Sequence, residues 1–201
     1  MPAPIDFYFD FSSPYGFLAS EKIEALATAH GRAVDWHPIL LGVVFKQTGA
    51  VPLTQVPLKG DYSRRDTARS AAFHGVRGFR MPSRFPIPTQ APARIVLWLK
   101  ARDATLAPAA VHALYRAFFV SDIDISNPEQ AAAVAAGCGV DAEAARAAID
   151  EPSIKEALKA ENDSAIARGV FGSPFVIVDG EPFWGHDRLE QVDCWLETGG
   201  W

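Results

Sequence analysis

The stretch Ile5-Asp-Phe-Tyr-Phe-Asp-Phe-Ser-Ser-Pro-Tyr-Gly16 holds the pattern that decides the fold. Polar and aromatic residues alternate over Ile5–Phe11, which predicts a β-strand. The strand runs into Ser12-Ser13-Pro14 and then into a helical pattern of apolar residues that Gly31 closes. Either serine can cap this helix, and a proline suits its first turn. A second strand is predicted over Ala33–Leu41, so the chain opens with a β-α-β unit whose strands should be parallel.

The C-terminal end has the pattern of a β-β-α unit. Phe175–Asp179 and Pro182–Trp184 are predicted strands, and Asp179-Gly180 between them has the chemistry of a tight hairpin turn. A last helix is predicted over about 187–197, where Leu189, Val192 and Leu196 share one face.

The middle of the chain differs from both ends. Residues 42–92 are punctuated by glycine and proline, and helical periodicity then dominates, with helices predicted over 92–102, 128–136, 142–149 and 152–168. The order of elements predicts an α/β thioredoxin-like fold interrupted by an all-helical insertion domain. We place the thioredoxin-like domain at residues 1–60 plus 169–201 and the helical insertion domain at 61–168.

Composition limits the class of protein. Of the 201 residues, 49% are hydrophobic and 21% charged, which is typical of a folded globular chain. The longest apolar run, Ile95–Leu99, is far shorter than a membrane span, and the N-terminus lacks the features of a signal peptide. We therefore expect a cytoplasmic protein that does not enter membranes. The two cysteines, Cys138 and Cys194, lie 56 positions apart, which excludes a CxxC pair and a cysteine-rich zinc site.

Charge is unevenly distributed along the chain. The net charge is −5, yet residues 59–102 hold ten lysines and arginines against two aspartates. This basic segment could attract a small anionic ligand, or it could be a solvated helical face paired with carboxylates elsewhere. It lacks the interleaved aromatics and motifs of nucleic-acid binding, so we expect no nucleic-acid partner. The spacing of the five histidines suggests no metal site.

Three short motifs carry chemistry. The first, Ser13-Pro-Tyr-Gly16, stands at the strand-to-helix junction where thioredoxin-fold oxidoreductases carry C-x-x-C. Without sulfur, dithiol chemistry cannot run there. A serine hydroxyl could instead donate a hydrogen bond to the thiolate of a ligand, at a helix N-terminus that favours negative charge. The alternative is that the serine is only a helix cap.

The second and third motifs lie near the C-terminus. Gly172-Ser-Pro174 before a strand is typical of a cis-proline loop, which would offer the backbone of Ser173 to an extended peptide ligand. The alternative is an ordinary trans turn. In Phe183–Leu189 (FWGHDRL), Asp187 could hold an ammonium group while neighbouring N–H groups hold a carboxylate. The alternative is again a helix cap.

Together these motifs resemble the family of 2-hydroxychromene-2-carboxylate isomerases and kappa-class glutathione transferases. FYFDFSSPYGFLA is similar to the opening strand and Ser-Pro turn of that family, and residues 38–49 and 56–62 are similar to the loop that follows. VFGSPF and FWGHDRL resemble its cis-proline and γ-glutamyl-binding motifs. The resemblance runs nearly end to end and is weakest in the helical insertion.

The resemblance implies glutathione as cofactor and Ser13 as the catalytic serine that holds its sulfur. The residues that it assigns to glutathione binding are Lys59, Ser173, Trp184, Gly185, His186 and Asp187. Ala50 stands where the family commonly has Asn, which removes a side-chain contact near the substrate pocket. Lys46 and Gln55 are further candidate substrate contacts. We expect a homodimer that acts on a small anionic aromatic substrate as an isomerase. The alternatives are a kappa-like transferase or peroxidase and a non-catalytic glutathione-binding protein.

Overall fold

A computed structural model describes residues 2–201 of the chain. The strands and α-helices, with the short 3-10 helices η1–η3 between them, follow in the order β1 (Ile5–Phe9), α1 (Pro14–Ala29), β2 (Val34–Pro38), α2 (Leu41–Thr48), η1 (Leu53–Gln55), α3 (Lys59–Phe73), α4 (Gln90–Arg102), η2 (Ala104–Leu106), α5 (Ala107–Phe119), α6 (Pro128–Ala136), α7 (Ala142–Ala148), α8 (Pro152–Ala167), β3 (Phe175–Val178), β4 (Glu181–Trp184), η3 (His186–Arg188) and α9 (Leu189–Thr198).

The strands form one mixed sheet in the order β2-β1-β3-β4. β1 and β2 are parallel, with Phe7 opposite Trp36. β3 is antiparallel to β1, with Phe7 opposite Val176. The two ends of the chain therefore share a sheet. This arrangement confirms the α/β thioredoxin-like fold expected from the β-α-β start and the β-β-α finish.

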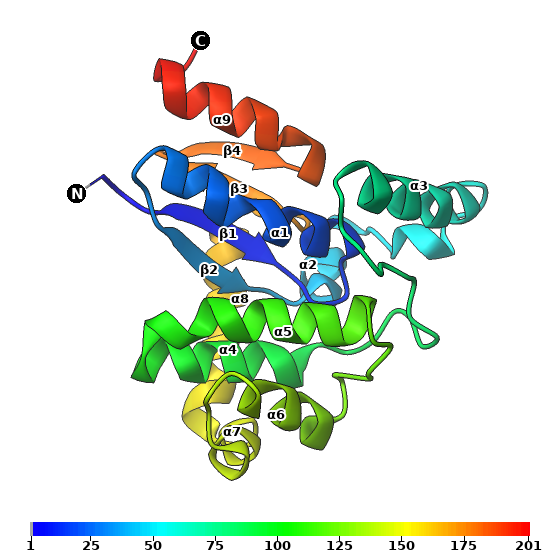
Figure 1. Cartoon of the computed structure of the whole chain (residues 1–201), viewed down its shortest axis with the longest axis vertical. Helices are drawn as coiled ribbons and strands as arrows, with labels where there is room; N and C mark the ends of the chain where they lie inside the picture. The colour runs from blue at the N-terminus through cyan, green and yellow to red at the C-terminus, as the bar shows by residue number, and fades with distance from the viewer. Residues whose placement is uncertain (1) are drawn as a thin grey trace.

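Helices cover both faces of this sheet because both faces are apolar. Phe7 and Phe9 belong to a large buried cluster with Phe17 of α1 and Tyr115 of α5. Tyr8 points to the other face, where it belongs to a second cluster that includes Ala165 of α8. Figure 1 shows α1 on the near side of the sheet, α8 behind it, and helices α4–α7 gathered below β2.

The turn between β3 and β4 uses the residues that the sequence indicates. Asp179 has φ 52° and Gly180 has φ 95°, so both lie in the left-handed region. Two such residues in a two-residue loop match the twist of the strands that they join. Arg32, just after α1, donates two hydrogen bonds to the Asp179 carboxylate, at 2.7 and 2.5 Å. This ion pair connects the turn to the N-terminal half of the chain.

Three sequence predictions differ from the structure. The first strand ends at Phe9 rather than Phe11, because Asp10 and Phe11 lead into the turn before α1. The second strand ends at Pro38 rather than Leu41, because Leu41 already begins α2. Residues 59–73, expected within a loop-rich region, form the 15-residue helix α3. The buried face of α3 consists of the small residues Gly60, Ser63, Thr67 and Ala71, so it has no apolar stripe for periodicity to detect.

The helices from α4 onward begin and end close to their predicted limits. α6 spans Pro128–Ala136 as predicted, and Asn127 caps it by accepting a hydrogen bond from the Gln130 N–H. Within residues 2–201, every helix is too short or too polar to cross a lipid bilayer. The division into residues 1–60 plus 169–201 and 61–168 stays a prediction.

Candidate functional site

Ser13 lies where β1 meets α1, and it is almost completely buried (4% exposed). Its Oγ accepts a hydrogen bond from the Gly16 N–H at 3.0 Å, so it is the N-cap of α1. The same hydroxyl donates to the backbone carbonyl of Ser173 at 2.9 Å. The cap predicted at this position is therefore real, and it is also a contact with a loop 160 residues later in the sequence.

The Ser173 loop has the predicted geometry. The Ser173–Pro174 peptide bond is cis, which confirms the predicted cis-proline loop. The loop also contacts Ser13. The Ser173 hydroxyl accepts a hydrogen bond from the Asp10 N–H at 2.9 Å. Two hydrogen bonds thus attach the loop to the strand-to-helix junction.

Asp10 is a component of the site that the sequence reasoning did not select. Its buried carboxylate accepts hydrogen bonds from the N–H groups of Leu41 (2.6 Å) and Ser12 (2.7 Å) and from the Thr89 hydroxyl (3.1 Å). Burial raises the pKa of Asp10 to about 6, against the effect of these hydrogen bonds. Its backbone carbonyl accepts from the Tyr115 hydroxyl at 2.9 Å. The sequence signal for Asp10 was its polar side chain between the two aromatic residues Phe9 and Phe11.

Gly16 stands at the position of the second cysteine in C-x-x-C relatives of the fold. A Cβ atom there would lie 2.6 Å from the Tyr115 hydroxyl and 2.9 Å from Ser173 Oγ. Both distances are far below van der Waals contact. The junction therefore has no space for a second thiol.

Tyr15 connects the start of α1 to α3 and to the C-terminal segment. Its hydroxyl donates to the Asp66 carboxylate at 2.6 Å, and its ring stacks on His186 with centroids 4.8 Å apart. Burial is the largest contribution that lowers the pKa of His186, so the imidazole beside Tyr15 favours the neutral form. His186, which the family resemblance assigns to glutathione, thus lies one side chain away from the α1 N-terminus.

Trp184 packs over the cis-proline loop. A Cβ on Gly172 would fall 2.3 Å from Trp184 Nε1, so only glycine leaves room for the indole. The Trp184 side chain nevertheless remains 56% exposed. Gly185 follows with φ 115°, and the Asp187 carboxylate is exposed and folds back toward Gly185. The structure thus brings four of the proposed glutathione contacts, Ser173, Trp184, Gly185 and His186, to the end of α1 that carries Ser13.

Lys59, Lys46 and Gln55 occupy exposed positions farther along the chain. Lys59 is the first residue of α3, and it precedes Asp66 by seven residues, so both lie on the same face of the helix. Lys46 lies in the last turn of α2. Gln55 belongs to η1 and lines a shallow cavity of about 230 Å³ together with Thr54 and Asp61. No contact in the structure joins these three side chains to Ser13.

Other reactive groups lie away from Ser13. Cys138 and Cys194 are free thiols, and Cys194 is exposed. His37, Asp6 and Asp35 hold their ligating atoms within 4.8 Å of one another. Lys100 and Arg168 already pair with these carboxylates, at 2.5 Å to Asp35 and 2.6 Å to Asp6. This cluster is therefore an ion-pair network in the structure.

The chain is similar along nearly its whole length to isomerases and to a kappa-class transferase. The chain is 29% identical, over 98% of its length and 99% of the relative, to a 2-hydroxychromene-2-carboxylate isomerase of Sphingobium xenophagum. It is 28% identical to glutathione S-transferase kappa 2 of Caenorhabditis elegans, over 96% of this chain and 91% of that one. A solved 2-hydroxychromene-2-carboxylate isomerase structure superposes with a TM-score of 0.86 at 25% identity, covering 96% of this chain and 94% of its own.

These relatives are an isomerase and a kappa-class glutathione transferase, which are members of the family that the motifs resemble. The model of the DsbA-like thioredoxin domain matches residues 4–196, which is nearly the whole chain. The match covers the sheet, the cis-proline loop and the intervening helices. The chain therefore belongs to the family of DsbA-like thioredoxin domains.

Proposed function

We propose that this protein is a glutathione-dependent isomerase that acts on a hydroxychromene carboxylate or a similar unsaturated 2-oxo acid. One observation carries the proposal. The Ser13 hydroxyl sits at the N-terminus of α1, bonded to the carbonyl of the cis-proline loop, in a junction that contains no cysteine. A thiolate used at this position has to come from a ligand. The similarity to a kappa-class glutathione transferase supports glutathione as that ligand.

Two features of the junction favour the thiolate form of a bound thiol. A free thiol has a pKa of about 8.5 and is only a few per cent ionised at neutral pH. The 16-residue helix α1 presents its positive end to the junction. A hydroxyl that donates to the sulfur adds a charge-assisted hydrogen bond, which is available only to the ionised form.

Ser13 has to exchange hydrogen-bond partners before it can act in this way. Its proton is committed to the Ser173 carbonyl in the structure. An extended peptide ligand that pairs with the loop would donate its own N–H to that carbonyl. The Ser13 hydroxyl would then be free to turn toward the sulfur, while the Gly16 N–H keeps hold of Oγ. Binding of the peptide and activation of its thiol are thereby coupled.

The remaining assignments follow the positions of the side chains. Trp184, Gly185 and His186 border the junction and would contact the γ-glutamyl part of glutathione, with Asp187 pairing with its ammonium group. Lys59 would approach from the start of α3. Lys46 and Gln55 are proposed substrate contacts, with the Lys46 ammonium balancing the substrate carboxylate.

The reaction that we propose regenerates the thiol. The thiolate adds to the electrophilic carbon of the unsaturated substrate, and the former double bond becomes single. In a hydroxychromene the hemiketal C–O bond opens to the 2-oxo form, which frees that bond to rotate, and elimination of the thiolate then restores the double bond in the other geometry. Glutathione leaves unchanged, so each turnover consumes no thiol.

A kappa-like transferase is the second candidate, supported by the C. elegans relative that aligns over 96% of the chain. The decisive experiment incubates the protein with glutathione and a hydroxychromene carboxylate and follows substrate absorbance and free thiol together. Isomerisation changes the absorbance at constant thiol, whereas conjugation consumes thiol as substrate disappears. A protein that binds glutathione but changes neither signal would be a non-catalytic binding protein, and the isomerase proposal would be wrong.

A further inference from the structure

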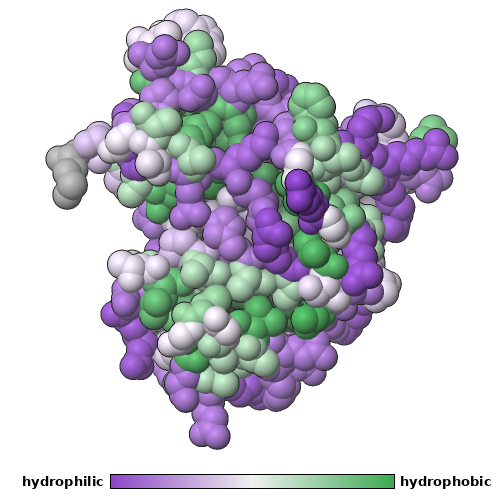
Figure 2. All heavy atoms as spheres, viewed as in Figure 1, coloured by the Kyte–Doolittle hydropathy of each residue, from purple (hydrophilic) through white to green (hydrophobic). Residues whose placement is uncertain are grey.

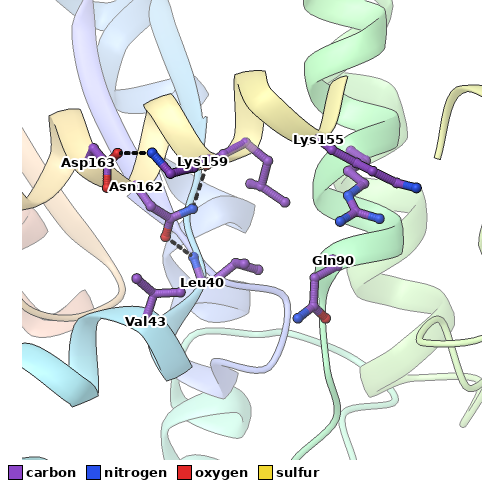
Figure 3. Close-up of a pocket in the computed structure, with 9 residues that line it drawn as sticks. Leu40, Val43, Gln90, Lys155, Lys159, Asn162 and Asp163 are labelled. Carbon is purple, nitrogen blue, oxygen red and sulfur yellow. Dashed lines mark hydrogen bonds and ion pairs between the residues drawn. The ribbon is translucent and has the colours of Figure 1, made fainter. Parts of the chain in front are cut away.

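A second pocket lies between the start of α2, the start of α4 and the middle of α8. It has a volume of about 260 Å³ and nine lining residues, none of which is assigned above to glutathione or to substrate. Figure 3 shows Gln90 on one side of the opening and Lys159 with Asn162 on the other. Its volume is close to the lower limit for small-molecule sites in proteins.

The charge of this pocket is not balanced within the chain. Its lining includes the cations Arg94, Lys155 and Lys159 and a single anion, Asp163. Lys159 pairs with Asp163 at 3.1 Å, and Lys155 pairs with Asp150 outside the lining at 3.3 Å. Both lysines project from the exposed face of α8 and are separated by one helical turn. The pocket therefore keeps an excess of positive charge around its opening.

Arg94 is the cation without a counter-ion. Within residues 2–201 it forms no ion pair, and its guanidinium has one hydrogen bond, from Nη1 to the Ile149 carbonyl at 3.1 Å. Its Nε is buried and has no partner at all. A partly buried guanidinium with unused donors is costly, because each unsatisfied buried polar group loses its hydration. An anion bound in the pocket would give this guanidinium a charged partner through its Nη groups.

The lining also has an apolar wall beside the polar residues Gln90 and Asn162. Leu40, Val43 and Leu158 provide the hydrophobic part of the wall. Asn162 is 2% exposed, and its side chain is occupied by the Leu40 N–H at 2.8 Å and the Leu158 carbonyl at 2.7 Å. The amide of Asn162 thus fixes the wall and does not compete for a ligand. A ligand that fits needs an anionic group for Arg94 and a compact hydrocarbon body.

We propose that this pocket binds a small organic carboxylate whose charged group pairs with Arg94 and whose apolar body rests on Leu40, Val43 and Leu158. Planar carboxylates match the fork of a guanidinium and form its strongest hydrogen bonds. The site is separate from the glutathione site, although Leu41, next to the wall residue Leu40, donates its N–H to Asp10 behind Ser13. Occupancy does not depend on the proposed catalytic function.

Benzoate is the probe for this site, with benzamide as its uncharged counterpart and sulfate as an anion without an apolar body. We expect calorimetric titration at low salt to show benzoate binding at least about tenfold more tightly than either control, as expected for a charge-assisted hydrogen bond plus apolar burial. Amide NMR shifts should concentrate at Leu40, Val43 and Gln90. Saturating glutathione should leave the benzoate affinity unchanged, so a failure of glutathione to bind would not affect this result.

Variants on α4 separate the pocket from general charge effects. Arg94→Met should weaken benzoate binding at least about tenfold. The matched control is Arg102→Met, because Arg102 is exposed on the same helix and lies over the Trp98 ring instead of in the pocket. This control should leave binding unchanged. Arg94 also donates a hydrogen bond to the Ile149 carbonyl, so its loss could disturb the local packing. Arg94→Lys is the variant that preserves the charge, and it should bind benzoate more tightly than Arg94→Met.

Several results would overturn the proposal. Equal affinity for benzoate and benzamide would remove the role of charge, and equal affinity for sulfate would remove the role of the apolar wall. Unchanged binding in Arg94→Met would show that the guanidinium does not hold the ligand, whereas a loss as large in Arg94→Lys as in Arg94→Met would show that the planar fork is needed as well as the charge. Shifts centred on Ser13 would place benzoate in the glutathione site.

Discussion

At the scale of single residues, Ser13 combines two roles that the sequence presents as alternatives. As the N-cap it satisfies the Gly16 N–H, and as a donor it reaches the Ser173 carbonyl. A hydroxyl has one proton and two lone pairs, so both bonds form at once. One lone pair of the hydroxyl is used in the helix cap in every state of the site. A bound ligand could give the hydroxyl proton a different acceptor.

Replacing Ser13 by alanine tests the proposed use of that proton. Ser13→Ala should lower isomerase turnover about tenfold to hundredfold, since a charge-assisted hydrogen bond is worth ~1.5–3 kcal/mol. Glutathione affinity should remain largely intact, because other contacts hold the peptide. Losing the cap should cost about 1 kcal/mol of stability, so rates are compared well below the unfolding temperature.

Ser12→Ala is the control for this prediction. The Ser12 hydroxyl accepts a hydrogen bond from the Ile87 N–H at 3.2 Å and makes no contact with the Ser173 loop. The bound thiol is titrated by its ultraviolet absorbance in both variants. A thiol pKa that rises only in Ser12→Ala would show that the wrong serine was selected. If neither substitution changes it, the end of α1 alone activates the thiol.

Gly16 is a residue whose missing side chain matters for packing. Gly16→Ala would place a methyl group 2.6 Å from the Tyr115 hydroxyl, and we expect a loss of about 1–3 kcal/mol in the free energy of unfolding. Gly42→Ala is the matched control, because a methyl group added there would meet no atom within 4 Å. Urea unfolding measures both. Equal stability of the two variants would mean that the junction can widen, and a thiol at position 16 would then be sterically possible.

At the scale of secondary-structure elements, a half-buried ionic cluster joins β1, β2 and α8. His37 on β2 contacts Glu161 of α8 at 2.6 Å, Asp6 of β1 at 3.2 Å and Asp35 at 3.3 Å. Burial disfavours the imidazolium, but hydrogen bonds with these three carboxylates outweigh it and raise the pKa of His37 to about 10. The histidine therefore carries a proton at neutral pH and, together with Lys100 and Arg168, balances the three carboxylates.

This protonation predicts a pH dependence of stability. A folded-state pKa above the ordinary value of 6.5 adds stability that is complete below about pH 6.5 and is lost as pH rises through about 10. His37→Gln should therefore be less stable than the wild type at pH 6.5, and the difference should shrink toward pH 10. Urea unfolding across this range measures it, with His30→Gln as control for an exposed histidine–aspartate pair. A difference that stays constant with pH would contradict a charged His37.

The elements also show what the sequence could and could not predict. The strands were predictable because they are short runs rich in aromatic and β-branched residues next to turn signals, and α1 because its apolar residues recur at the helical period. Helix α3 was missed because its buried positions are Gly60, Ser63, Thr67 and Ala71. In the site, Ser13 and the cis bond at Pro174 followed from motifs. Asp10 had a signal in its polar side chain between Phe9 and Phe11, but its contacts with Thr89 and Tyr115 form only by tertiary folding, so spacing along the chain could not predict them.

At the scale of the whole molecule, the candidate site is assembled from segments far apart in sequence. The start of α1, the start of α3, the cis-proline loop and the end of β4 would all contact one ligand. If glutathione binds only the folded chain, it stabilises the whole fold by mass action. At a hundredfold excess over its Kd, reduced glutathione should add about 2.7 kcal/mol to the free energy of unfolding.

Thermal unfolding with and without glutathione measures this stabilisation. The comparison peptide is γ-glutamylalanylglycine, which keeps both ends of glutathione and lacks the sulfur. It should raise the unfolding temperature less than glutathione does, because it brings no sulfur to the N-terminal end of α1. No stabilisation by either peptide would argue against a glutathione site formed by these four segments.

The outer edge of β4 limits how copies of this chain can associate. Pro182 lies opposite Ile177, one position beyond the Val178–Glu181 pair that closes the hairpin, so its nitrogen faces away from β3. A further strand that paired with this edge would need an N–H donor at position 182, and proline has none. The exposed carboxylate of Glu181 lies next to it. This edge of the sheet is thereby a poor template for edge-to-edge polymerisation. If two copies of the chain associate, helical surfaces are the better candidates, such as the patch of apolar residues over the α4–α7 layer in Figure 2.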